Sequence, residues 1–495
     1  MRVIILTVIF SILVVSAGNA QTKELHEMGV KGYALVLDMQ FEEANKIFDE
    51  MVRKEPENAL GHLLMALSYG RMWESNGSDK KLGKKYEGLL EKTLDIAEEM
   101  LDKNEDDINA LFYAGCANGK LDLYYMHTGE KIKAYTNGRK GTDFLEEVVE
   151  KDPLYYDAYV GIGLFHYYIR ILSEQSKMLS MVVGDTEGFR EKGIDEINLA
   201  ISKGKYVNDE AKIILATDIY MDFDDNDKAA LPLLNEITAK YPGNHFLKLH
   251  LIECYRNLNK YELALQTAED LVQSESLKKN KYLINRLYYN IGSAYLKLNE
   301  SEKAIMAFKS ALEAPQYKAS SLYYIGYSYE MMRRIDKAYE YYYQIEESDD
   351  KNLYKSAKSR MDNPLTLARI KFIKGTNYLE CGKYTQAAEI LNNLIKVELK
   401  KEKPDKMFMA NVYFNIGRVE YELKEYERAI QTFQKVLDSN DVKADFVKPW
   451  CHYYLENIYR DTGKTEKAKK EYDAAYKHEG KVLRPLIEEA RKKMQ

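Results

Sequence analysis

The chain has 495 residues, of which 45% are hydrophobic and 30% are charged, a composition typical of a folded protein with much helix. Its net charge is −6 and the two signs are interspersed, so no broad basic stripe is present to replace phosphate counterions. These features argue against a nucleic-acid-binding protein. Tyrosine is abundant, with 41 copies, and its apolar ring and wet hydroxyl suit a thin core close to solvent.

The first twenty residues have the pattern of an export signal. Arg2 is a short positive end, residues 3–17 are an apolar run, and residues 18–20 place small side chains where a signal peptidase needs them. The apolar run is shorter than the roughly 20 residues that cross a bilayer as a helix. We therefore expect a signal peptide over residues 1–20 and a periplasmic or envelope-associated protein. An uncleaved anchor is the alternative, and no later segment is apolar enough to span a membrane.

A helix-pair frame begins soon after this segment. Gly32 and Ala44 occupy the two small-residue positions of a first repeat, and Phe48 occupies its large-residue position. Residues 58–110 and 111–153 look like further pairs with longer helices. The whole of 21–244 is thus expected to consist of divergent repeats.

A more specific arrangement lies in the middle of the chain, within residues 105–240. Gly163 is followed by Tyr167 and Tyr168, and further along Asp185 precedes the run Arg-Glu-Lys-Gly that begins at Arg190. This arrangement resembles the divergent repeats of exported bacterial tetratricopeptide proteins. It is more distantly similar to an outer-mitochondrial-membrane family that includes the fungal inclusion-body clearance protein. The resemblance implies a helical fold and a scaffold role, and it offers no catalytic residues.

The repeat is clearest in residues 245–480. Gly292 and Gly326 are 34 residues apart, which is the tetratricopeptide period, and each is followed at fixed offsets by a small and a large residue. Further copies follow with their glycines at Gly375 and Gly417. The small residues should let two helices approach closely, and stacking neighbours should bury the remaining apolar faces.

The frame resembles the tetratricopeptide repeat family from about residue 245 to the C-terminus. The resemblance implies an all-α, right-handed superhelical solenoid of antiparallel helix pairs. The spacing stretches near residues 349–364 and 400–406, where we expect polar insertions between repeats. Residues 481–495 are charged and lack a partner frame, so they are expected to form a C-terminal capping helix.

No enzyme or metal signature survives a test of its spacing. Asp222, Asp224 and Asn226 have the look of a calcium loop, but Asp227 and Leu233 occupy the positions that require glycine and glutamate. The four cysteines are far apart and are expected to be separate core residues. The predicted protein has no cofactor, no metal and no catalytic residue.

The family resemblance implies that the first helix of each pair lines a concave groove for a peptide or protein. Counted from the frame glycines, the positions expected to face this groove are Tyr289, Ser293, Leu296, Tyr323, Tyr327, Glu330, Phe372, Thr376, Leu379, Phe414, Arg418 and Tyr421. Arg286 and Arg369 could meet an acidic ligand at its edge. Two interpretations remain open for the aromatic residues, because tyrosines at helical spacing also pack between repeats. The lysine and asparagine of a carboxylate clamp for chaperone C-termini are absent.

Taken together, these patterns predict a non-catalytic protein–protein interaction scaffold of the bacterial periplasm or cell envelope. The partner would be a protein or peptide of unknown identity. The alternative is a carrier or sensor of small apolar ligands such as lipids, which would use the aromatic lining.

Overall fold

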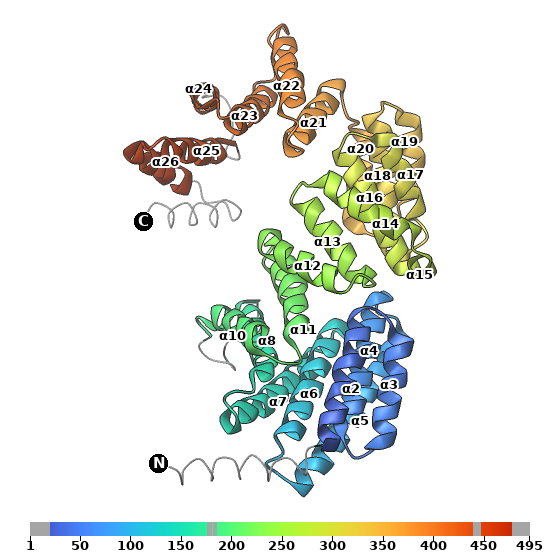
Figure 1. Cartoon of the computed structure of the whole chain (residues 1–495). Coiled ribbons are helices and arrows are strands. Elements are labelled where there is room, and N and C mark those ends of the chain that lie inside the picture. The colour runs from blue at the N-terminus through green and yellow to red at the C-terminus, as the bar shows by residue number, and fades with distance from the viewer. Residues whose placement is uncertain (1–19, 176–180, 182–185, 439–446, 478–495) are drawn as a thin grey trace. The chain divides into compact units, whose positions relative to one another are not determined.

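The computed structural model describes residues 20–175, 181, 186–438 and 447–477 (Figure 1). Every regular element in these ranges is a helix, which confirms the expected all-α fold. Residues 1–19 of the expected signal peptide and the expected capping helix of residues 481–495 lie outside the described residues, while Ala20 begins the first described helix. No helix in the described ranges is long and apolar enough to cross a membrane.

The chain forms two compact units. Unit 1 comprises the described residues up to Leu258 together with Gln266–Leu287, and unit 2 comprises Asn259–Leu265 and the described residues from Tyr288 onward. The division falls within α14 (Tyr261–Gln273) and α16 (Lys281–Lys297). The sequence-based boundary at residue 244 separates divergent from regular repeats rather than compact units, and it stays a prediction.

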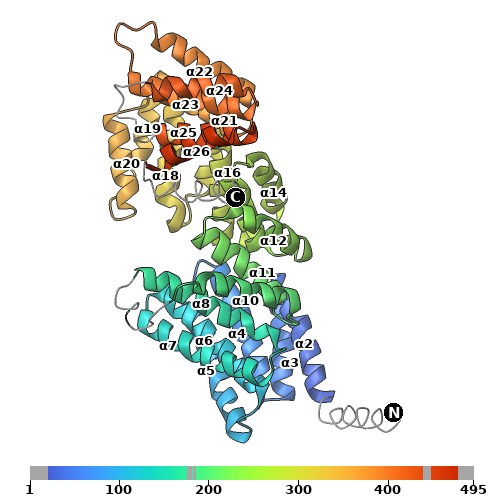
Figure 2. The same ribbon diagram turned by 90° about the vertical axis from the view of Figure 1, so that its left-hand side faces the viewer.

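Unit 1 begins with four helix pairs stacked in chain order (Figure 2). They are α2 (Ala20–Leu37) with α3 (Phe41–Lys54), α4 (Ala59–Ser75) with α5 (Lys80–Lys103), α6 (Ile108–Thr128) with α7 (Lys131–Lys151), and α8 (Tyr159–Gln175) with α10 (Phe189–Lys203). A short 3-10 turn, Tyr156–Ala158, precedes α8. The helices from α4 to α7 are long, as the sequence predicts for these two pairs.

The helices that follow α10 in unit 1 pack back against its first helix, α2. It contains α11 (Asn208–Ile214), a π-helical segment (Leu215–Phe223), α12 (Asp227–Lys240), α13 (His245–Asn257) and α15 (Glu275–Lys279). The Asn244 side chain donates to the Leu37 carbonyl at 2.6 Å, and the Gly243 amide donates to Asp38 at 2.7 Å. Leu37 also packs in one apolar cluster with Ile213. These contacts join segments about 200 residues apart, so α2 packs against α11–α13 as well as against α3 and α4.

Unit 2 is also a stack of helix pairs. Its helices beyond α16 are α17 (Ser301–Ser310), α18 (Pro315–Met331), α19 (Ile335–Tyr342), α20 (Lys351–Asp362), α21 (Leu367–Glu380), α22 (Tyr384–Glu398), α23 (Lys406–Glu422), α24 (Tyr426–Leu437), α25 (Val447–Asp461) and α26 (Thr465–Lys477). Separate apolar clusters lie between successive pairs instead of one central core. This is how a linear repeat array buries its apolar faces.

The frame glycines mark the close approach of the two helices in a pair. A Cβ atom built on Gly326 would lie 2.6 Å from the ring of Tyr342, and one on Gly417 would lie 2.6 Å from the ring of Phe433. A Cβ at Gly292 would meet the ring of Phe308 at 2.8 Å. Real Cβ atoms do not tolerate such distances, so the prediction that small residues permit close helix packing is confirmed.

The first insertion differs from the irregular connection that its polar sequence suggests. It contains α20, whose N-cap residue Asp350 accepts hydrogen bonds from the amides of Asn352 and Leu353. The fully buried Glu330 of α18 lies 3.2 Å from the guanidinium of Arg360 on α20. A capped helix held by a buried ion pair therefore replaces the expected loop. Residues 400–405 lie between α22 and α23, and Lys406 is the first residue of α23.

Candidate functional site

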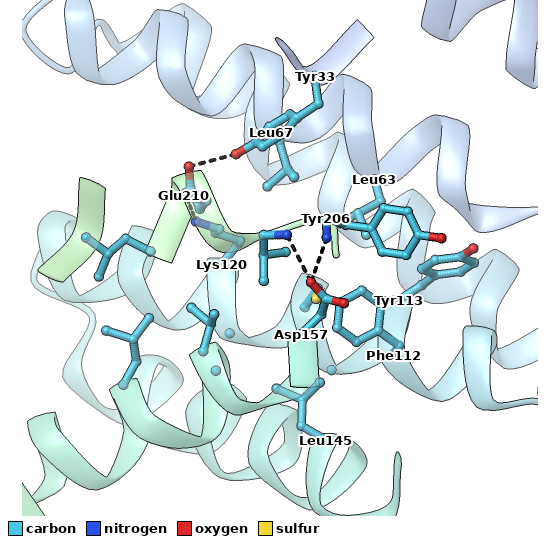
Figure 3. Close-up of a pocket in the computed structure, with 18 of the residues that line it drawn as sticks. Tyr33, Leu63, Leu67, Phe112, Tyr113, Lys120, Leu145, Asp157, Tyr206 and Glu210 are labelled. Carbon is cyan, nitrogen blue, oxygen red and sulfur yellow. Dashed lines mark hydrogen bonds and ion pairs between the residues drawn. The ribbon is translucent and has the colours of Figure 1, made fainter. Parts of the chain in front are cut away.

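The most developed cavity in the described part of unit 1 has a volume of about 510 Å³ (Figure 3). Helices α2, α4, α6, α7, α8 and α11 and the segment before α11 contribute its walls. This volume lies within the range of about 300–1,000 Å³ that is typical of small-molecule sites. Because α2 packs against α11–α13, these helices close one side of this space, which remains partly open to solvent.

Glycines on α6 and α7 create much of the space. A Cβ on Gly141 would lie 2.9 Å from the backbone nitrogen of Gly119, so the two helices touch through their backbones here. A Cβ on Gly119 would meet nothing within 4 Å, although this residue lines the cavity. Its missing side chain therefore faces empty space rather than a packed neighbour.

Aromatic rings form a second wall. Phe112 of α6 lies 5.0 Å from the ring of Tyr155, and Tyr113 beside it is almost fully buried. Burial raises the pKa of Tyr155 far above its ordinary value of 10. The ring of Tyr206 stacks on that of His26 at 5.3 Å, and Tyr206 is 41% exposed. The partly exposed Tyr206 thus marks where this apolar lining reaches solvent.

A buried carboxylate, Glu210 of α11, ties three helices to the cavity wall. It accepts hydrogen bonds from the Tyr33 hydroxyl at 2.7 Å (Figure 3), the Arg71 guanidinium at 2.6 Å and the Lys120 ammonium at 3.0 Å. Burial would raise the pKa of Glu210, but the two cations outweigh it and hold that pKa well below its ordinary 4.5. Glu210 is therefore an ionised structural anchor that joins α2, α4 and α6 to α11.

Asp157 has an equally complete set of partners. Its carboxylate accepts hydrogen bonds from the amides of Lys205, Tyr206 and Val207 at 3.0, 2.8 and 3.0 Å (Figure 3). These bonds satisfy backbone donors before the start of α11. Asp157 thus fixes the segment that carries Tyr206 at the cavity.

Asp122 of α6 is different from the other carboxylates that line the cavity. Within the described ranges it has no hydrogen bond and no ion pair, and a Cβ on Gly138 would lie 2.8 Å from its Oδ2 atom. Burial raises the pKa of Asp122 from its ordinary 3.8 to about 7. The cavity lining therefore contains one carboxyl group without a partner in the described ranges.

The predicted groove residues do not come together at this cavity. Arg286 belongs to unit 1, where it is buried, pairs with Glu253 through two hydrogen bonds of 2.8 and 2.5 Å, and lies over the ring of Phe246. All the others belong to unit 2.

The aromatic members of the predicted set take part in packing between repeats. Each lies half-buried against an apolar cluster: Tyr289, Tyr323, Phe372, Phe414 and Tyr421. Tyr327 stacks on Tyr323 at 6.4 Å, and burial raises the pKa of Tyr327 to about 12. Since half-buried rings still present part of their surface, their packing does not decide whether they also bind a partner.

The polar members of the set have varied positions. Ser293 donates to the carbonyl of Tyr289, one turn earlier in its own helix. Arg369 is exposed and lies 5.2 Å from the ring of Phe408. Arg418 donates to the Asn415 side chain at 3.0 Å and lies 5.8 Å from the ring of Phe414.

Two of the residues that follow a frame glycine by four positions do not line a groove. Glu330 is fully buried and accepts a hydrogen bond from the Tyr342 hydroxyl at 2.9 Å. Leu379 is 5% exposed and lies within an apolar cluster. The expectation that these two residues face a ligand is wrong. On α18 and α21, the side chain at this position packs between helices and does not face a groove.

The cysteines are four free thiols, as the spacing predicts. Cys254 and Cys451 are buried, and Cys116 lines the cavity, where burial raises its pKa to about 12. The Cys116 thiol is therefore protonated and poorly nucleophilic. No group of three metal-binding side chains occurs in the part of the chain that the structure describes.

The sequence-based prediction missed the cavity altogether. A signal for it existed in the glycines of α6 and α7, which recur at Gly115 and Gly119 and again at Gly138 and Gly141. Glycine is a poor helix former, so repeated glycines on facing helices indicate a close approach or an open space. The packing of α2 against α11 produces no comparable periodic pattern in the sequence.

The architecture is that of an all-α protein built from repeated helix pairs. Residues 286–316, 320–350 and 374–442 each match a family model of the tetratricopeptide repeat. The chain is therefore a tetratricopeptide repeat protein. Such repeats support the expected role as a protein–protein interaction scaffold, and their families are generally non-catalytic.

The chain also matches several solved structures at low sequence identity. A tetratricopeptide repeat protein from Parabacteroides merdae is 18% identical, with 58% of this chain and 98% of that chain covered and a TM-score of 0.24. MamA of AMB-1 is 16% identical over 41% of this chain and 97% of its own, with a TM-score of 0.20. A chain of the Cut9–Hcn1 hetero-tetramer of the APC/C is 14% identical, with 93% of this chain and 95% of that chain covered and a TM-score of 0.25. No curated protein sequence matches the chain.

Proposed function

We propose that this protein is a scaffold of the bacterial periplasm or cell envelope that binds a peptide or protein through the first helices of its repeats. The observation that carries the proposal is the run of tetratricopeptide matches over residues 286–316, 320–350 and 374–442. The apolar run and small residues at the N-terminus support export.

The surface proposed for the partner lies on the first helices of unit 2. Tyr323 and Tyr327 lie side by side on α18, while Phe372 on α21 and Phe414 on α23 repeat the aromatic character. Amphipathic rings of this kind supply contact area at protein interfaces without requiring a charged partner. The exposed Arg369 at the start of α21 would add attraction for an acidic segment.

Site-specific photocrosslinking in the native cell tests this surface. A photoreactive amino acid placed at Tyr327 or Arg369 is expected to form a discrete adduct with one protein. The same group at Met306, which is 71% exposed on the second helix α17, is the matched control and should not form that adduct. Equal adducts from all three positions, or none from any, would refute binding through the first helices.

The cavity in unit 1 specifically favours a second candidate function, that of a carrier or sensor of small apolar ligands. Its volume of about 510 Å³ and its aromatic and glycine walls fit a small molecule. Native mass spectrometry of the purified protein tests this function directly. A ligand mass that is present in the wild type and absent after substitution of Gly119 would support it, and a ligand-free spectrum after reconstitution with lipid extract would count against it.

A further inference from the structure

The unit 1 cavity contains a polar group that its walls do not satisfy. The carboxylate of Glu210 has three side-chain donors, and that of Asp157 has three backbone donors. Asp209 accepts from Lys240 at 2.5 Å and from the Tyr241 hydroxyl at 2.6 Å. Asp122 alone among the four carboxylates lining the cavity has no such partner in the described ranges.

The cations of the lining are already engaged or lie at its edge. Lys120 is bound to Glu210 and Lys240 to Asp209, and Lys205 is an exposed residue. A buried acid that lacks a partner costs stability unless a cation or hydrogen-bond donor reaches it. A ligand with a negative head would instead meet Asp122 without any free buried cation to compensate.

We propose that the unit 1 cavity binds a primary amine with an apolar body, and that Asp122 receives the ammonium group. The inference rests on the carrier function proposed second above. The glycine and aromatic walls would hold the body, and the unpartnered carboxylate would hold the head. At roughly 30 Å³ for each water-sized group, 510 Å³ accommodates on the order of 17 such groups.

A peptide fits this space less well than such an amine does. Each peptide residue brings a backbone donor and acceptor that need partners when they are buried. Three of the four carboxylates in this lining, Asp157, Asp209 and Glu210, already have hydrogen-bond donors as partners. A molecule with a single cationic head matches a wall with a single unpartnered carboxylate.

The experiment compares three probes that differ only in their head. Dodecylamine, dodecanol and dodecanoate, each below its micellar concentration, are titrated into the full chain at pH 8 by calorimetry. The amine is expected to bind about tenfold or more tightly than the alcohol, because a charge-assisted hydrogen bond is stronger than a neutral one. The acid is expected to bind most weakly of the three.

Three variants assign any binding to this site. Asp122→Asn should remove the advantage of the amine over the alcohol and leave alcohol affinity within about threefold. Gly119→Leu should abolish binding of every probe, because its side chain would enter the open cavity. Gly88→Leu is the matched control: Gly88 is exposed on α5 and a Cβ there also meets nothing within 4 Å, so binding should not change.

The outcomes separate the inference from the function on which it rests. Equal affinity for the three heads, with all binding lost in Gly119→Leu, would overturn the assignment of an amine while keeping the carrier function. Failure of every probe to bind the wild type would overturn both. If Asp122→Asn does not fold, the head-group series in the wild type and the Gly119→Leu variant still decide the question.

Discussion

At the scale of single residues, the carboxyl groups that line the unit 1 cavity are of two kinds: three have hydrogen-bond donors as partners, and Asp122 has none in the described ranges. Glu210 connects α2, α4, α6 and α11 through hydrogen bonds to Tyr33, Arg71 and Lys120. Asp122 makes no comparable contribution in the described ranges. The first kind should stabilise the protein, and the second should reduce its stability.

Substitution of Glu210 should be strongly destabilising. Glu210→Gln leaves Lys120 without its counter-charge and Arg71 with only Glu74 as its acidic partner, and it should cost about 3–5 kcal/mol. Tyr33→Phe removes one hydrogen bond and should cost only about 1 kcal/mol. Urea unfolding followed by Trp73 fluorescence, in a Trp450→Phe background, measures both, because the chain contains only two tryptophans. Equal effects of the two substitutions would contradict the anchoring role of Glu210.

Substitution of Asp122 should instead stabilise the protein at high pH. Burial raises the pKa of Asp122 from 3.8 to about 7, so the folded state binds this proton more tightly than the unfolded state does. The contribution of Asp122 to stability is therefore fully present below about pH 4 and is lost as the pH rises through about 7. Asp122→Asn removes that fall and should gain about 3 kcal/mol more at pH 8 than at pH 5. Parallel pH profiles of the two proteins, measured with the same fluorescence signal, would show that Asp122 is well solvated.

At the scale of helices, each frame glycine faces a large residue on the second helix of its pair. The contact is close at Gly326, where a Cβ would lie 2.6 Å from Tyr342, and looser at Gly375, where it would lie 3.0 Å from Leu391. A rigid ring cannot move away as easily as the end of a leucine side chain. The two sites should therefore differ in their tolerance of an added methyl group.

The pair Gly326→Ala and Gly375→Ala tests this difference. Overpacking a filled site costs about 1–3 kcal/mol, whereas alanine in a helix gains about 1 kcal/mol over glycine. Gly326→Ala should thus be destabilising and Gly375→Ala close to neutral. Urea unfolding of unit 2 followed by circular dichroism measures both, and restoration of Gly326→Ala by Tyr342→Leu would identify the ring as the cause. Neutral behaviour of Gly326→Ala would contradict close packing at this site.

The helices also show how far the sequence alone could predict this structure. The 34-residue spacing fixed the pairs in unit 2 because every determinant, such as Gly292 against Phe308, lies within one repeat. Asp350 is a recognisable N-cap, but the polar composition that follows it concealed α20. The aromatic residues expected in a groove were ambiguous, since Tyr323 and Tyr327 are partly packed and partly exposed.

At the scale of the whole molecule, the cavity and the closure of unit 1 could not be predicted. They depend on contacts such as that between Tyr33 and Glu210, which are 177 residues apart and leave no period in the sequence. Each of the two units can be understood separately as a stack in which neighbouring pairs cover one another. Stability in such a stack is approximately a sum of terms for each pair and each contact between neighbours.

The stability of each helix pair in unit 2 should therefore depend on its contact with the neighbouring pair. Ala410, Phe433 and Val436 of α23–α24 share an apolar cluster with Cys451 and Leu455 of α25. A chain that ends at Asp438 would lack α25–α26 and expose that cluster. Hydrogen exchange measured by mass spectrometry on this chain and on the full chain tests the dependence. We predict faster exchange in α23–α24 with unchanged protection in α2–α8, whereas unchanged protection throughout would contradict the stacking of interdependent pairs.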